Sequence, residues 1–368
     1  MTSRPLSRAE IIDRIESLLN DSANTTFSAA RLGTLLEDAI TEISEAVPYV
    51  SRDIYTIESR FGNASSTSAS NLVDSSKSQF ASGDTGKVVY NKTDKTWAVI
   101  TSFSSTSQVG LSNDIFTSGE PYEIYNKGCW NRKQINIENS DDFIWVIGAV
   151  YPVLPDWGYP QVNMRNVKLY NENKIAEIDV GWVDDSGLST ADKDVHVYFA
   201  RQHKLNDMTD LLGAVNNGAG YAAGSTSIIL KNLQTSGTLY KDTLFTIALA
   251  SGISSRLTYR VTADATITTN AATITFTPGL ESAIVDSAVV TFTGSTLTPE
   301  LERIIVPIVA GEALMSQGVF SINRFSRGGT STPRNFYDIG ERMAEKARRR
   351  LKSFVDVGLR SRHSYSRS

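Results

Sequence analysis

The sequence contains a single cysteine, Cys129, and three histidines. One cysteine excludes a disulfide bond within the chain and any cysteine-rich metal site. With three histidines, few residues can serve as the histidine of a Ser-His-Asp triad, and no Gly-x-Ser-x-Gly nucleophile elbow occurs in the sequence. His196 and His203 lie seven residues apart with no Cys or Glu at ligand spacing. We therefore interpret both as ordinary strand or strand-end histidines rather than zinc ligands.

Long apolar runs and a strong overall charge are also missing. No run of about 18 apolar residues occurs, and residues 1–10 lack the apolar core of a signal peptide. The net charge of −4 gives no overall bias toward nucleic acid. We expect a protein that is made in a reducing compartment and has no contact with a membrane.

Two polar clusters resemble known sites only superficially. Gly83 to Lys87 has the wrong spacing for a phosphate loop, and Val88 stands where a metal-binding hydroxyl is needed, so a turn is favoured. Four aspartates lie close together in the sequence: Asp184, Asp185, Asp192 and Asp194. A calcium loop is one interpretation of this cluster, and a solvated acidic loop is the favoured one. We expect no enzyme, no catalytic residue, no cofactor and no resident metal; the alternative is an active site assembled from distant loops.

The middle of the chain is rich in aromatic residues. One group can line a sugar-binding face: Trp130, Tyr151, Trp157, Tyr159 and Trp182. Core and inter-domain packing is the favoured interpretation, because Trp and Tyr are common in the cores of β-sandwiches.

Helical periodicity is confined to the two ends of the chain. Ser7 and Glu10 form a capping-box pattern before an apolar stripe, and Ser28 can cap a second helix that ends near Pro48. A third, short helix is predicted from Ile54, Ile57 and Phe61. At the other end, Thr298-Pro299-Glu300 and Thr332-Pro333 each begin an amphipathic helix, and Pro307 is expected to kink the first of these.

Short β-rich runs separated by turn residues fill the region between these helices. The predicted fold class is α+β and multidomain: a helical bundle of N- and C-terminal helices with an insertion of two small β-barrel-like modules and a β-sandwich. The predicted boundaries are 1–62 for the first helices, 63–128 for a linker and the first barrel, 129–218 for the sandwich, 219–295 for the second barrel, 296–357 for the last helices, and 358–368 for a basic tail.

The two barrel-like segments have similar patterns. Residues 97–101 align with 257–262, 109–112 align with 272–276, and each segment closes on a final strand, 122–125 or 288–292. We predict that the second barrel is a diverged copy of the first.

Basic residues gather at the C-terminus. From Arg342 onward, nine Lys and Arg residues accompany two acidic ones, Glu345 and Asp356. Since the rest of the chain is acidic, this concentration favours an acidic protein partner, with DNA contact a lesser alternative. The predicted partner-binding residues are Arg342, Arg348, Arg349, Arg350, Arg360, Arg362 and Arg367.

Three helical segments, 29–47, 297–314 and 336–354, resemble the helical core of the head-to-tail adaptor (connector) proteins of tailed bacteriophages. The β-run at 83–125 resembles modules common in phage structural proteins. The resemblance implies a virion neck protein, assembled in the host cytoplasm, that forms a homo-oligomeric ring, expected to be a dodecamer. Its implied partners are the portal protein, tail or tail-completion proteins, and the genomic DNA passing through the lumen. The alternative is another tail, collar or baseplate component with carbohydrate-binding β-modules.

Overall fold

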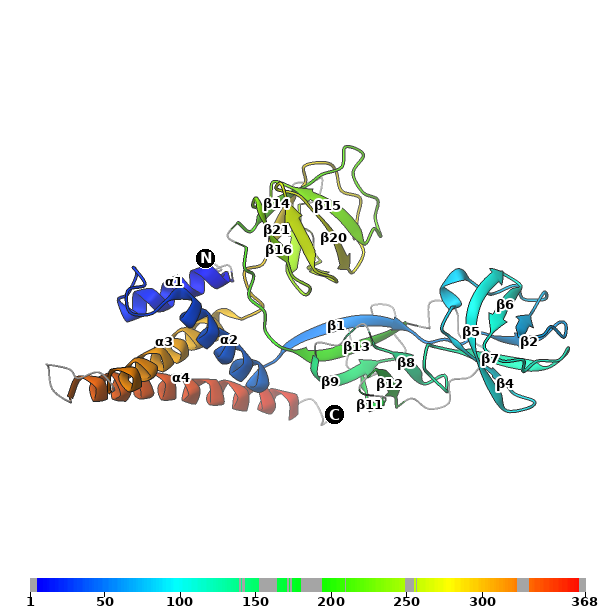
Figure 1. Ribbon diagram of the computed structural model, residues 1–368, viewed down its shortest axis with the longest axis horizontal. Helices are drawn as coiled ribbons and strands as arrows, with labels where there is room; N and C mark the ends of the chain where they lie inside the picture. Colours follow the sequence, from blue (N-terminus) through cyan, green and yellow to red (C-terminus); the bar gives the residue numbers. More distant parts are fainter. Residues whose placement is uncertain are drawn as a thin grey trace. The chain divides into compact units, whose positions relative to one another are not determined.

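The computed structural model gives an α+β protein with helices at the chain ends and strands between them (Figure 1). It describes residues 5–138, 140, 143–151, 164–170, 172, 174–179, 194–208, 210–248, 255, 257–322 and 331–363, and within these not the side chains of 320–322, 331–333 and 354–363. The chain divides into two compact units. We call Met1–Tyr49 with Gln202–Ser368 the helix–barrel unit, and Val50–Arg201 the inserted unit.

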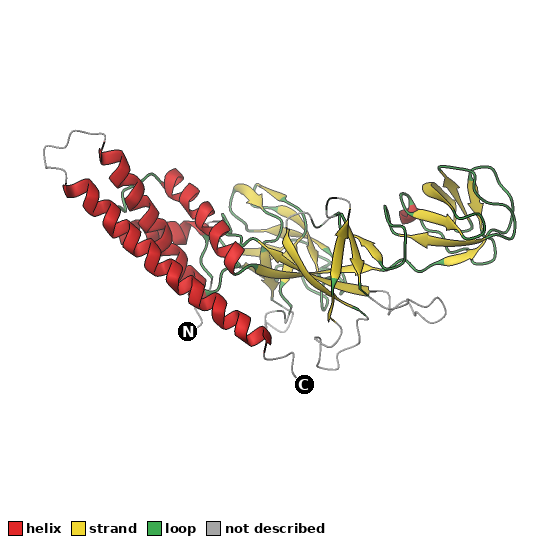
Figure 2. Ribbon diagram, turned by 90° about the horizontal axis from the view of Figure 1, so that it is seen from below, coloured by secondary structure: helices red, strands yellow, loops and turns green. Residues whose placement is uncertain are grey.

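The helix–barrel unit contains all four α-helices of the described part of the chain, α1 (Arg8–Leu19), α2 (Ala29–Ala46), α3 (Pro299–Ile322) and α4 (Ser331–His363). Helices α3 and α4 lie side by side (Figures 1 and 2). One hydrophobic core takes residues from all four helices, including Ile15, Leu36, Ile305 and Leu351, each at most 4% exposed. Helices from opposite ends of the sequence therefore share one interior.

The predicted helix starts are confirmed where side chains are described. Ser7 and Glu10 form the capping box of α1, and the Ser28 hydroxyl accepts a hydrogen bond from the Arg31 amide at the start of α2. The Thr298 hydroxyl accepts from the amide of Leu301 and begins α3. Pro307 lies inside α3, which continues through it to Ile322.

A closed six-stranded barrel completes the helix–barrel unit. Its strands are β14 (Leu212–Val215), β15 (Ser227–Lys231), β20 (Ala272–Thr277), β18 (Tyr259–Val261), β17 (Leu244–Ile247) and β21 (Val289–Phe292), in the order in which they neighbour one another. A separate two-stranded sheet pairs β16 (Ser236–Leu239) with β19 (Ala265–Thr268). Strand β14 lies within the segment predicted as sandwich, so the predicted boundary at 218/219 is wrong.

The inserted unit contains three sheets. One sheet is formed by β1 (Tyr49–Thr56), β13 (Asp194–Arg201), β9 (Phe143–Val150) and β10 (Met164–Arg165), and a second by β11 (Val167–Tyr170), β12 (Ile175–Ile178) and β8 (Gln134–Asn136). These two sheets share a core that includes Ile137, Ile178 and Val197. The third sheet orders its strands as β2 (Phe61–Asn63), β7 (Pro121–Tyr125), β4 (Val88–Asn91), β5 (Thr96–Ser105), β6 (Gln108–Leu111) and β3 (Asn71–Val73).

The third sheet, predicted as a barrel-like module, is a half-barrel: β2 and β3 form its two ends, and an isolated bridge, Ser66–Val73, links them. Its strand order nevertheless matches that of the closed barrel. The strands neighbour one another in the order β2-β7-β4-β5-β6-β3 in the half-barrel and β14-β21-β17-β18-β20-β15 in the closed barrel. If β16 and β19 are set aside as an addition and each set is numbered along the chain, both orders are 1-6-3-4-5-2. This common order supports the predicted duplication.

Three further expectations are corrected. Residues 54–61 do not form a helix, since β1 runs to Thr56 and β2 begins at Phe61. Residues 63–82 are not a free linker, because they supply β3 to the half-barrel. The expected tail at 358–368 begins as helix, since α4 continues to His363.

Candidate functional site

The exposed basic face of α4 is the candidate site. The helical period turns Ala344, Ala347 and Leu351 into the core, at 1%, 3% and 4% exposure. The exposed side of the helix carries five basic residues, and we define the basic face of α4 as Arg342, Lys346, Arg349, Arg350 and Lys352. Over this stretch the exposed acidic side chains are Glu341 and Glu345. The sequence prediction of a basic surface here is therefore supported at Arg342, Arg349 and Arg350.

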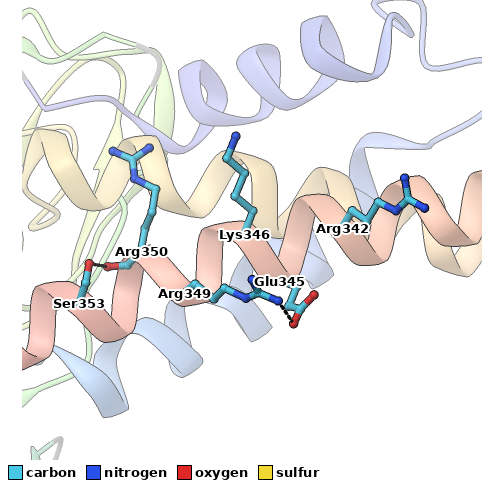
Figure 3. Close-up of a pocket in the computed structure, with 6 residues that line it drawn as sticks. All are labelled: Arg342, Glu345, Lys346, Arg349, Arg350 and Ser353. Carbon is cyan, nitrogen blue, oxygen red and sulfur yellow. Dashed lines mark hydrogen bonds and ion pairs between the residues drawn. The ribbon is translucent and has the colours of Figure 1, made fainter.

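An open hollow of about 520 Å³ runs along this face, lined by Arg342, Glu345, Lys346, Arg349, Arg350 and Ser353 (Figure 3). Lys346 and Arg350 project from one side of the helix in Figure 3, and Arg349 lies toward Glu345. Arg349 donates a hydrogen bond of 2.6 Å from Nη2 to Glu345 Oε1, which raises the pKa of the guanidinium. Within the described part of the chain, Arg342, Lys346 and Arg350 form no ion pair, so their charges are available to a partner.

Arg348 does not belong to this face. Its Nε and Nη2 donate to the two carboxylate oxygens of Glu42 in α2, at 2.7 and 2.8 Å, and Nη2 also donates to Glu312 in α3. These bonds raise the pKa of the guanidinium, and they join three helices. The predicted partner role of Arg348 is replaced by a structural one, because its charge is already neutralised within the chain.

For the remaining three predicted arginines, the structure describes at most the backbone. Arg360 and Arg362 lie in the last turns of α4, and their side chains are outside the described residues. Arg367 lies wholly outside the described residues.

Several other sequence candidates take ordinary structural roles. Asp84, in the segment compared with a phosphate loop, is 2% exposed and pairs with Arg60 and with Lys87 at 3.1 Å. His203 is buried, with Nδ1 3.0 Å from the Thr296 hydroxyl and Nε2 2.9 Å from the Val47 carbonyl oxygen. Burial lowers the pKa of His203. The two contacts hold its imidazole ring between Val47, which follows α2, and Thr296, which precedes α3.

The acidic cluster and His196 provide no metal site in the described residues. Asp184, Asp185 and Asp192 lie outside them, and Asp194 accepts a hydrogen bond from Thr56. His196 is half-buried on β13, and its pKa is lowered by burial and by the charge of Arg52. Where side chains are described, no three His, Cys, Asp or Glu residues come close enough together to hold a metal ion.

The predicted aromatic face is not assembled as expected. Tyr151 is buried in the core of the inserted unit, and Trp130 is 45% exposed with its ring edge-on to Tyr170. The other three, Trp157, Tyr159 and Trp182, lie outside the described residues. Sequence reasoning missed Trp97 on β5, which is 40% exposed and has its ring centroid 4.2 Å from that of Tyr90.

The side chains on the basic face of α4 suit binding to an anionic surface. The side chains along its hollow are guanidinium, ammonium, hydroxyl and one paired carboxylate, which recognise carboxylates or phosphates by charge and hydrogen bonding. None of the helices that the structure describes has the length and apolar content needed to span a bilayer. No protein-family model, curated protein or solved structure matches the chain.

Proposed function

We propose that this chain is a structural virion protein, a head-to-tail adaptor that joins the portal of a tailed bacteriophage to its tail. In this proposal the four helices form a bundle that builds a homo-oligomeric ring, and twelve copies match the twelve-fold symmetry of the portal. The β-modules and the sandwich of the inserted unit extend from the ring toward tail proteins, and DNA passes through the lumen without catalysis.

The observation that carries the proposal is the common core of helices from both ends of the chain. Ile15 and Leu36 precede the β-structure by sequence and Ile305 and Leu351 follow it, yet all four lie in one hydrophobic cluster. A helical body interrupted by a long β insertion is the organisation that the adaptor resemblance implies. It leaves the β-modules free to make contacts of their own.

The basic face of α4 supports a partner-binding role for the same body. Several unpaired cations on one rigid helix present fixed charges, and the helix continues toward Arg360 and Arg362. This charge favours an acidic protein surface as the partner, either on the portal or on a second copy of this chain.

Truncation tests the portal contact. A chain ending at Val357 lacks the last 11 residues, including Arg360, Arg362 and Arg367. We expect it to keep its helical circular dichroism and to bind purified portal at least tenfold more weakly than the full chain. Equal portal affinity of the two chains would contradict the role of the C-terminal arginines.

A second candidate function is favoured by Trp97. Its ring packs against Tyr90 on the outer side of the half-barrel and remains 40% exposed, an arrangement that can stack on a sugar ring. A collar or baseplate protein with a glycan-binding β-module would lose glycan binding in Trp97→Ala and keep it in the Val357 truncation. An adaptor without this activity would show no glycan binding in either chain.

A further inference from the structure

A second surface of the helix–barrel unit carries the opposite charge to α4. From Thr34 onward, the exposed residues of α2 form one stripe at helical spacing: Thr34, Glu37, Asp38, Thr41 and Glu45. Residues 32–46 contain no Lys or Arg, so no positive charge of α2 itself interrupts the stripe. We call these five residues the acidic stripe of α2.

Two of the three acidic residues in the stripe have no salt bridge within the described part of the chain. Glu37 pairs with Arg8 at 2.8 Å, but Asp38 and Glu45 form no ion pair within the described part of the chain. The opposite side of α2 is buried, with Leu36, Ala39 and Ile43 at most 2% exposed. Like the basic face of α4, the stripe therefore points away from the core of its own chain.

The spacing of the charges on the two helices is similar. At a rise of about 1.5 Å per residue, Asp38 and Glu45 are separated by about 11 Å along α2, and Arg342 and Arg350 by about 12 Å along α4. Lys346 lies midway between the two arginines and on the side of Arg350 (Figure 3). Two helices in contact can bring these charges opposite one another in either relative direction.

We propose that the acidic stripe of α2 in one copy of this chain docks against the basic face of α4 in a second copy. Pairing of α4 with α4, or of α2 with α2, would place like charges together, so the charges favour contact between different faces. Repetition of such a heterologous contact produces a ring if the rotation closes. The inference deepens the proposed adaptor function and rests on its ring, and it assigns the contact that would hold neighbours together.

The strength of this contact depends on several ion pairs acting together, because single exposed pairs are weak and screened by salt. We therefore expect association that is strongest at low ionic strength and that gains from ring closure, in which each further contact is intramolecular. Neither property requires the portal to be present.

Charge reversal tests the contact in the full-length chain without portal. One variant reverses the stripe (Asp38→Lys with Glu45→Lys), and a second reverses the basic face (Lys346→Glu with Arg350→Glu). Sedimentation at low salt should show association of the unmodified chain and at least tenfold weaker association of each variant alone. An equimolar mixture of the two variants should associate again, because each then offers the face that the other lacks.

A matched control carries the same charge change elsewhere. Asp13→Lys with Glu300→Lys alters two exposed acidic residues outside the stripe and should associate like the unmodified chain. Helical circular dichroism verifies that every variant is folded. Unchanged association of either reversed variant, failure of the mixture to recover, or a chain that is monomeric at every concentration would each overturn the inference.

A second measurement locates the contact directly. Asp38→Cys in one copy and Lys346→Cys in another should form an intermolecular disulfide on oxidation, whereas Ser17→Cys paired with Lys346→Cys should not. Cys129 adds little background, because it is buried and its burial raises the pKa of the thiol to about 12. Portal binding by chains that fail both tests would leave the adaptor function standing and reject only this contact.

Discussion

Gly311 of α3 and Gly340 of α4 lie directly against each other. A Cβ placed on Gly311 would lie 2.5 Å from the carbonyl oxygen of Gly340, and a Cβ on Gly340 would meet the carbonyl oxygen of Gly311. Each glycine thus leaves room for the other's backbone. This reciprocal contact allows α3 and α4 to approach closely enough to pack side by side.

We predict that Gly311→Ala destabilises the helices. The added methyl group must push two backbones apart, which costs about 1–3 kcal/mol in overpacked interiors. Gly218→Ala is the control, because nothing lies within 4 Å of a Cβ at that position. Thermal unfolding followed by helical circular dichroism should move to lower temperature in the first variant and stay unchanged in the second.

The distribution of tryptophan makes this measurement specific to one unit. All five Trp residues of the sequence fall within Val50–Arg201, whereas α1 to α4 belong to the other unit. Tryptophan fluorescence therefore follows the inserted unit and circular dichroism follows the helices. A fluorescence transition that shifts with Gly311→Ala as much as the helical signal would contradict a local effect.

We predict that Arg348 and Arg350 have different roles although they are two residues apart. Arg348→Ala removes charge-assisted bonds to Glu42 and Glu312 and should lower the stability of the helices by about 1 kcal/mol, since the site is partly exposed. Arg350→Ala should leave stability unchanged and weaken partner binding. Chemical unfolding and a binding assay on both variants distinguish the roles, and an exchange of the two phenotypes would refute the assignment.

We predict that Glu58 makes the inserted unit sensitive to acid. Burial raises the pKa of Glu58, but the hydrogen bonds from Arg60 and the charge of Lys87 outweigh burial and lower the pKa to about 2. The folded pKa is below the ordinary value of 4.5, so the stabilisation is complete above pH 4.5 and is lost as pH falls toward 2.

The variant Glu58→Gln tests this dependence. It should cost about 2 kcal/mol at neutral pH, because hydrogen bonds to a charged group are lost. It should also reduce the slope of stability against pH between 4.5 and 2, measured by tryptophan fluorescence. A slope equal to that of the unmodified chain would show that the Glu58 carboxylate is not the group responsible.

The strand β1 shows why part of the fold could not be predicted from sequence. Two of its inward residues are polar and two of its outward ones are apolar: Ser51 and Asp53 are buried, while Val50 and Ile54 are 45% and 47% exposed. Arg201, distant in sequence, donates to Ser51 at 2.7 Å and to Asp53 at 2.9 Å. Apolar spacing indicated a helix because the partner that allows a polar interior lies on another strand.

Residues 63–82 were missed for a related reason. Its buried apolar residues, Ala64, Leu72 and Phe80, lie eight residues apart and form no periodic stripe. Hydrogen bonds also hold the segment: Asp74 accepts from the amides of Ser76 and Lys77, and Lys77 Nζ donates to the Phe61 carbonyl oxygen. By contrast, the helices and the similarity of the two barrel-like segments were predictable, because caps, periodic apolar residues and repeated strand patterns are visible in the sequence itself. The role of Arg348 was not, because Glu42 and Glu312 reach it through tertiary structure.

The most direct test of the central claim is the mass of the particle that the full-length chain forms with purified portal, measured by native mass spectrometry. The account predicts a ring in which a fixed number of copies, twelve if the symmetry of the portal is shared, binds one portal. A chain that stays monomeric and leaves the mass of the portal unchanged would contradict it.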